Sequence, residues 1–190
     1  TLLTIVGIGV AMMEIVLMGA MGDGLVTQMG GMVGGSGAHL VGIETGGSID
    51  LSKIDEDAIR RINTMPGVRA AEGFLTGYTV VGDLPFFIVY GYAPRGLAIR
   101  EFKVVEGTPL TTNRQILLGA VAAENLKMGV GQTIRIFGSS FKIVGIYETG
   151  VPFQDGGGVM TLRDAQRLFG QPRKVSFMGV WLEDPGQGEV

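Results

Sequence analysis

The sequence LLTIVGIGVAMMEIVLMGAM, residues 2–21, is almost entirely apolar, and only Thr4 and Glu14 interrupt it. An α-helix rises about 1.5 Å per residue, so a helix of this length spans about 30 Å, the thickness of a bilayer's hydrocarbon core. No second stretch of this kind follows. We therefore expect residues 1–21 to form one transmembrane helix, truncated at its start because Thr1 already belongs to it.

A cleaved signal peptide and a buried helix of a soluble protein are the two other interpretations of this stretch. A signal peptide has a basic start and an apolar stretch of about 7–15 residues. This sequence lacks the basic start, and its apolar stretch is longer than that range. A helix that is apolar on all sides rarely fits a small domain. Because no Lys or Arg precedes Lys53, and cytoplasmic flanks are rich in both, we expect the main domain to lie outside the cytoplasm, at the inner membrane of the cell.

Three residues of this helix are candidates for packing against other helices. Glu14 lies near the middle of the span, where a carboxylate costs several kcal/mol unless it is protonated or faces a partner. Gly7 and Ala11, four residues apart, form a small-residue face that permits close helix contact. We expect these residues to contact further transmembrane helices or a second protomer, although a solitary anchor with a protonated Glu14 is the simpler alternative.

The composition of the remaining chain excludes several classes of function. The net charge is −3 with no basic stripe, so nucleic acid is not an expected partner. With no cysteine, one histidine and no Gly-Lys pair, the chain lacks disulfides, a typical zinc site and a phosphate-binding loop. His39 beside Ser36 is too weak a pair for a nucleophilic site, and Asp155-Gly156-Gly157-Gly158 offers too few ligands for calcium. We expect no enzyme activity and no cofactor in this chain.

Hydrophobic patterns after a Gly-rich linker, residues 22–37, predict alternating strands and short helices. Three helices are expected at residues 54–65, 120–128 and 162–169. Strands are expected at residues 38–44, 68–81, 86–92, 115–118, 133–137, 141–147 and 175–182. This order predicts an α+β fold with a mixed sheet.

Finer signals mark the ends of these elements. Ser52 with Asp55 resembles a capping box before the first helix, and Thr161 with Asp164 begins the last one. Gly138-Ser139-Ser140 predicts a three-residue hairpin turn. Asp155–Gly158 is expected to be a mobile turn.

An aromatic group stands in the strand at residues 86–92, namely Phe86, Phe87, Tyr90 and Tyr92. Alternating aromatic residues of this kind usually form a core face. The more specific hypothesis is a hydrophobic contact surface for a substrate or a partner protein.

The order of several short motifs resembles that of a known family. The motifs are Gly22-Asp23-Gly24, Met65-Pro66-Gly67-Val68, Val105-Glu106-Gly107, Ile116-Leu117-Leu118-Gly119, residues 128–134 (MGVGQTI) and residues 141–146 (FKIVGI). Together they are similar to the extracytoplasmic core domain of the MacB/FtsX-like ABC-transporter permeases, which include the lipoprotein-releasing LolC/LolE permeases. Gln132 departs from the family's usual Asp at a surface turn.

The resemblance implies an architecture and a set of partners. A transmembrane helix precedes a mixed α/β porter lobe, expected here at residues 38–81 and 111–190 without its final helix, with a small inserted β-rich lobe at residues 82–110. The implied partners are a cytoplasmic ABC ATPase that binds the ATP, a second permease protomer, the lipid bilayer, and a periplasmic adaptor or lipoprotein substrate. The implied function couples ATP-driven motion to export or release of a substrate. A single-span sensor or ligand-binding protein is the alternative from another class, and a membrane-tethered enzyme is the third.

Overall fold

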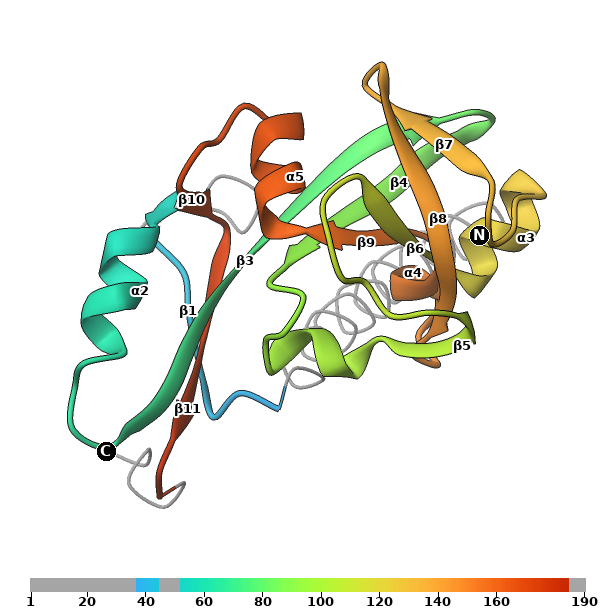
Figure 1. Cartoon of the computed structure of the whole chain (residues 1–190). Helices are drawn as coiled ribbons and strands as arrows, with labels where there is room; N and C mark the ends of the chain where they lie inside the picture. The colour runs from blue at the N-terminus through green and yellow to red at the C-terminus, as the bar shows by residue number, and fades with distance from the viewer. Residues whose placement is uncertain (1–36, 45–51, 185–190) are drawn as a thin grey trace, which may run out of the picture. The chain divides into compact units, whose positions relative to one another are not determined.

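The computed structural model describes residues 37–44 and 52–184, and the large sheet dominates this part of the chain (Figure 1). The expected membrane helix with Gly7, Ala11 and Glu14, and all of the expected linker except Gly37, lie outside the described residues. None of the helices that the structure describes is long and apolar enough to cross a membrane.

The described elements alternate between strands and short helices, with η2 denoting a 3-10 helix. In chain order they are β1 (Leu40–Gly42), β2 (Ile54–Asp55), α2 (Glu56–Ile62), β3 (Val68–Val81), β4 (Leu84–Tyr92), η2 (Ala98–Glu101), β5 (Lys103–Gly107), β6 (Gln115–Gly119), α3 (Ala120–Leu126), β7 (Thr133–Ile136), β8 (Ser139–Glu148), α4 (Pro152–Asp155), β9 (Gly158–Thr161), α5 (Leu162–Leu168), β10 (Lys174–Val175) and β11 (Phe177–Leu182).

Nine strands form one mixed sheet in the order β1-β11-β3-β4-β9-β6-β8-β5, and β7 pairs with β8 beside this path. The pairs β4–β9 and β6–β8 are parallel, and the other pairs are antiparallel. Strands β2 and β10 form a separate two-stranded ribbon. The expected α+β class with a mixed sheet is confirmed for the part of the chain that the structure describes.

Strand β3 joins two parts of this sheet, because its partner strand changes halfway along. Its first half, Val68–Phe74, pairs with β11, whereas its second half, Leu75–Val81, pairs with β4. In Figure 1, β3 runs from the end of the sheet that holds β1 and β11 to the hairpin with β4. The strand therefore connects a small part of the sheet with the larger part that contains β4, β9, β6, β8, β5 and β7.

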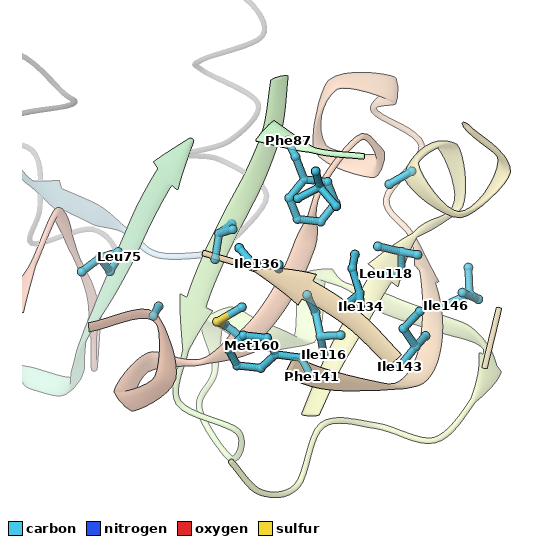
Figure 2. Packing of buried hydrophobic residues seen from close by; sticks show 14 residues of the cluster. Leu75, Phe87, Ile116, Leu118, Ile134, Ile136, Phe141, Ile143, Ile146 and Met160 are labelled. Carbon is cyan, nitrogen blue, oxygen red and sulfur yellow. The ribbon is translucent and has the colours of Figure 1, made fainter. Parts of the chain in front are cut away.

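The two faces of the larger sheet part bury different cores. One face carries the cluster shown in Figure 2, which includes Phe87, Ile116, Ile134 and Met160, and residues of α3 and α5 pack against it. The opposite face carries an aromatic-rich cluster, in which the members are Phe74, Ile88, Tyr90, Tyr92, Ala98, Phe102, Leu110, Leu117, Val144, Tyr147, Val159 and Trp181. A third, smaller cluster forms around Ile59 and Val175, where α2 covers β3 and β11.

The sheet pairing shows where the strands of residues 82–110 lie, and the division into two lobes stays a prediction. Residues 82–110 were expected to form an inserted β-rich lobe, and they contain β4 and β5, which pair with β3, β9 and β8 of the same sheet. The change of partner along β3 lies earlier, at Phe74 and Leu75. Turn signals at residues 82–83 and 94–96 mark hairpin and loop ends, and turn chemistry does not reveal which distant strands pair.

Two local expectations are corrected by the contacts. Ser52 does not cap the first helix: its hydroxyl accepts a hydrogen bond from the amide of Glu44, and Asp55 is the residue before α2. The hairpin between β7 and β8 turns at Phe137-Gly138, two residues that both have positive φ, so Ser139 and Ser140 belong to β8. This is the backbone of a type I′ turn, whose twist matches that of the flanking strands.

Candidate functional site

The four aromatic residues of the expected contact surface lie on three different parts of the domain. Phe87, Tyr90 and Tyr92 are buried, with exposed fractions of 0%, 3% and 4%, whereas Phe86 is 51% exposed. Phe87 points into the cluster of Figure 2, and Tyr90 and Tyr92 belong to the aromatic cluster of the opposite face. Because successive side chains of a strand alternate between the two faces, these three residues form core and no common surface.

Phe86 is the member that solvent reaches, and it stacks on a neighbouring strand. Its ring centroid lies 4.7 Å from that of Tyr78 and 5.9 Å from that of Phe153. Tyr78 and Val80 on β3 are 37% and 65% exposed. The outer end of the β3–β4 hairpin therefore presents an apolar patch on one face.

A group of buried polar atoms lies inside the aromatic cluster. The Tyr92 hydroxyl donates to Oε1 of Glu101 at 3.0 Å, and the Tyr147 hydroxyl donates to the Gln154 carbonyl at 2.6 Å. The Tyr90 hydroxyl and Oε2 of Glu101 are buried and have no hydrogen-bond partner among the described residues. Sequence reasoning missed Glu101, since a single glutamate between Arg100 and Phe102 gives no pattern that separates it from a surface residue.

Burial alters the acid–base behaviour of this group. It raises the pKa of Glu101 from its ordinary value of 4.5 to about 7, although the hydrogen bond from Tyr92 acts in the opposite direction. Burial also raises the pKa values of the tyrosine hydroxyls, and the charge of Glu101 adds to the shift at Tyr92. A buried carboxyl without a cation favours its neutral form, because the ionised form loses hydration.

The other candidates from the sequence have structural roles. His39 accepts a hydrogen bond from the Leu182 amide at Nδ1, which ties the start of β1 to the end of β11, and Ser36 lies outside the described residues. Asp155 is buried and accepts hydrogen bonds from the amide and hydroxyl of Thr149 at 2.8 Å. The turn expected at Asp155–Gly158 is found at Gly156-Gly157, between the end of α4 and the start of β9, and its mobility stays a prediction.

A depression of about 400 Å³ opens to solvent between the start of α2 and the junction of β9 with α5. Its lining includes Glu56, Asn113, Thr161 and Arg163. The Thr161 hydroxyl donates to Asn113 and accepts from the Asp164 amide, so its hydrogen-bonding capacity is used internally. Within the described ranges, no group of three or more His, Cys, Asp or Glu side chains is placed to hold a metal ion.

Two solved structures share this fold at low sequence identity. The periplasmic region of MacB from Actinobacillus actinomycetemcomitans is 13% identical, with a TM-score of 0.57 over 69% of this chain and 65% of that structure. The extracellular domain of the noncanonic ABC-type transporter YknZ from Gram-positive bacteria is 15% identical, with a TM-score of 0.59 over 71% of this chain and 76% of that structure. The chain thus spans less than two thirds of the MacB region. No curated protein sequence matches the chain.

The fold is therefore one that forms extracytoplasmic domains in other bacterial proteins. A family model described as the MacB-like periplasmic core domain matches residues 1–189. The chain belongs to this family, which is one of ABC-transporter permeases, and the resemblance in the order of the sequence motifs is confirmed.

Proposed function

We propose that this chain is the extracytoplasmic part of an ABC permease, and that it transmits ATP-driven motion of the membrane segments to the export or release of a substrate. The single observation that carries the proposal is the family match over residues 1–189. The described sheet adds to it, because the two structures with the same fold are extracytoplasmic regions as well.

The proposal includes a set of partners and a place in the cell. A cytoplasmic ABC ATPase binds and hydrolyses the ATP, so that this chain itself needs no cofactor and catalyses no reaction. The predicted helix of residues 1–21 anchors the domain in the bilayer, and Glu14, Gly7 and Ala11 contact helices of the permease or of a second protomer. A periplasmic adaptor or a lipoprotein are candidates for the protein that meets the domain outside the membrane.

Distance measurements between protomers test this transmission. The chain has no cysteine, so Arg135→Cys places a spin label on the exposed side of β7 without competing thiols in this chain. The complete gene product is purified with its ATPase in lipid nanodiscs, and the label distances are measured without nucleotide and with a non-hydrolysable ATP analogue. We expect the distance distribution between the two labels to change with the analogue.

A matched control uses an ATPase variant that cannot bind ATP, and this variant should leave the distances unchanged. Unaltered distances with the intact ATPase would contradict transmission through this domain. Failure of the ATPase and the chain to copurify would contradict the proposed partnership and favour a single-span sensor.

A further inference from the structure

Residues 97–102, named here the covering segment, close over the aromatic cluster on one face of the sheet. Phe102 lies at the centre of this contact, with its ring centroid 5.5 Å from Tyr90, 5.2 Å from Tyr92 and 5.0 Å from Tyr147. Ala98 and Phe102 are buried, and Leu97 and Ile99 pack against the same cluster. The covering segment therefore shields a large part of this core from solvent.

Two carboxylates hold the covering segment, and their environments differ. Glu72 on β3 accepts hydrogen bonds from the amides of Leu97, at 2.7 and 2.9 Å, and of Ala98, at 3.2 Å. These backbone amides stabilise the charge of the Glu72 carboxylate directly. Glu101, inside the segment, has only the Tyr92 hydroxyl as a partner among the described residues, and its second oxygen is buried and unpaired.

No cation faces Glu101 from the elements that pack against this cluster. The titratable groups there are, by element, Glu72 on β3, Tyr90 and Tyr92 on β4, Tyr147 on β8 and Asp155 on α4. Arg100 and Lys103, the nearest cations along the chain, are exposed, and neither forms an ion pair with Glu101 in the described part of the chain. An ionised Glu101 would place charge on a buried oxygen, Oε2, that has no partner among the described residues.

We propose that Glu101 is a proton-dependent switch: its neutral carboxyl keeps the covering segment closed on the tyrosine cluster, and its ionisation opens the segment. When Glu101 is protonated, its carboxyl carries no charge that needs hydration, and it keeps its contact with Tyr92. The charged side chain regains hydration only if the segment moves away from the cluster. This inference stands on the contacts of the domain and does not depend on the proposed transport function.

The sign and size of the effect follow from proton linkage. The closed form binds the proton with a pKa of about 7, and the open form binds it with the ordinary value of 4.5. The stabilisation of the closed form is therefore complete below pH 4.5 and is lost as the pH rises through 7. The ratio of open to closed segment should increase about tenfold between pH 6 and pH 8. From well below pH 4.5 to well above pH 7, the full increase should be about 300-fold.

Hydrogen exchange of the full chain in detergent micelles measures this opening. The amides of Arg100 and Phe102 donate to carbonyls within the segment, so their exchange reports its opening. After correction for intrinsic exchange, we expect their protection to fall about tenfold from pH 6 to pH 8 in the wild type. Glu101→Gln, which stays neutral, should remove this fall, and Glu106→Gln on the exposed β5 should behave as the wild type does.

A direct titration of the wild type covers the case in which Glu101→Gln fails to fold. The carboxyl ¹³C shift of Glu101, followed by NMR, should titrate with a midpoint near 7. A midpoint near 4.5 would overturn the proposal. An equal pH dependence of protection in the wild type and in a folded Glu101→Gln variant would also overturn it.

Discussion

Two tyrosines of the aromatic cluster, Tyr90 and Tyr147, are both buried but differ in what their hydroxyls meet. The Tyr147 hydroxyl donates to the Gln154 carbonyl, whereas the Tyr90 hydroxyl has no partner among the described residues. We expect Tyr147→Phe to lower the free energy of unfolding by about 0.5–1.5 kcal/mol, because it removes one buried hydrogen bond while the Gln154 carbonyl keeps the Gly157 amide as a donor. Urea denaturation measures the difference.

Tyr90→Phe is the matched control for this prediction. It removes a buried hydroxyl that forms no hydrogen bond with the described residues, so stability should stay the same or increase. Equal losses from both substitutions would mean that the hydrogen bond of Tyr147 contributes nothing beyond the volume of its hydroxyl.

One local polar contact, at the start of the last helix, could be predicted from the sequence, whereas the Ser52 cap was wrong and the distant contacts gave no signal. Thr161 accepts the Asp164 amide three residues later, as the expected helix start requires. The carboxylate of Asp164, however, accepts the amide of Arg114 at 2.6 Å, fifty positions earlier in the chain. Glu72 likewise meets the Leu97 amide across 25 positions. Glu101 meets Tyr92 only nine positions away, but the contact depends on how η2 folds back over β4, so neither glutamate was a candidate from the sequence.

At the scale of elements, Gly77 on β3 allows the end of helix α5 to approach the sheet. A Cβ at this position would overlap the ring of Phe169, the residue directly after α5. Gly77→Ala should therefore lower the free energy of unfolding by about 1–3 kcal/mol, since extra volume in a packed core forces neighbours apart. Urea denaturation again provides the measurement.

Gly129→Ala is the control, because a Cβ at Gly129 has nothing within 4 Å and the residue has no positive φ. In a Phe169→Ala background, Gly77→Ala should become nearly neutral. If Gly77→Ala remains costly there, the clash with Phe169 is not its cause.

The long strand β3 was predicted well from the sequence, whereas the short strand β9 was missed. The expected strand at residues 68–81 coincides with β3, whose side chains differ in burial along its length. No strand was expected at residues 158–161, where Gly158 was assigned to a turn and Thr161 to a helix start, yet Gly158–Thr161 forms β9, which lies between β4 and β6 with every residue buried. A four-residue strand that is buried throughout has no alternation to detect, and its glycine resembles a turn.

For the whole molecule, we expect the domain to unfold in one transition, because β3 belongs to both parts of the sheet. Trp181, the only tryptophan, is buried on β11 and reports on the smaller part. A dye on Arg135→Cys in β7 reports on the larger part. The urea transitions of the two probes should coincide.

A variant at the junction provides the control for this prediction. Phe74 stacks on Tyr92 and Phe177, with ring centroids 5.2 and 5.3 Å away, at the point where β3 changes its partner. Phe74→Ala should lower the midpoints of both probes together, at a cost of about 3–5 kcal/mol. An earlier transition of Trp181 in the wild type would show that the two parts unfold separately.

The continuity of β3 has a mechanical consequence. The register places the starts of β1 and β3 and the end of β11 at one end of the sheet, where Leu40 lies opposite Val180 and Val68 lies opposite Leu182. From there, the fourteen residues of β3 extend about 46 Å to Val81 at the far hairpin. A displacement of the sheet at the starts of β1 and β3 is therefore transmitted along the continuous backbone of β3 to the far hairpin. We expect β3 to bend most easily at Phe74 and Leu75, because no partner strand runs continuously past both residues.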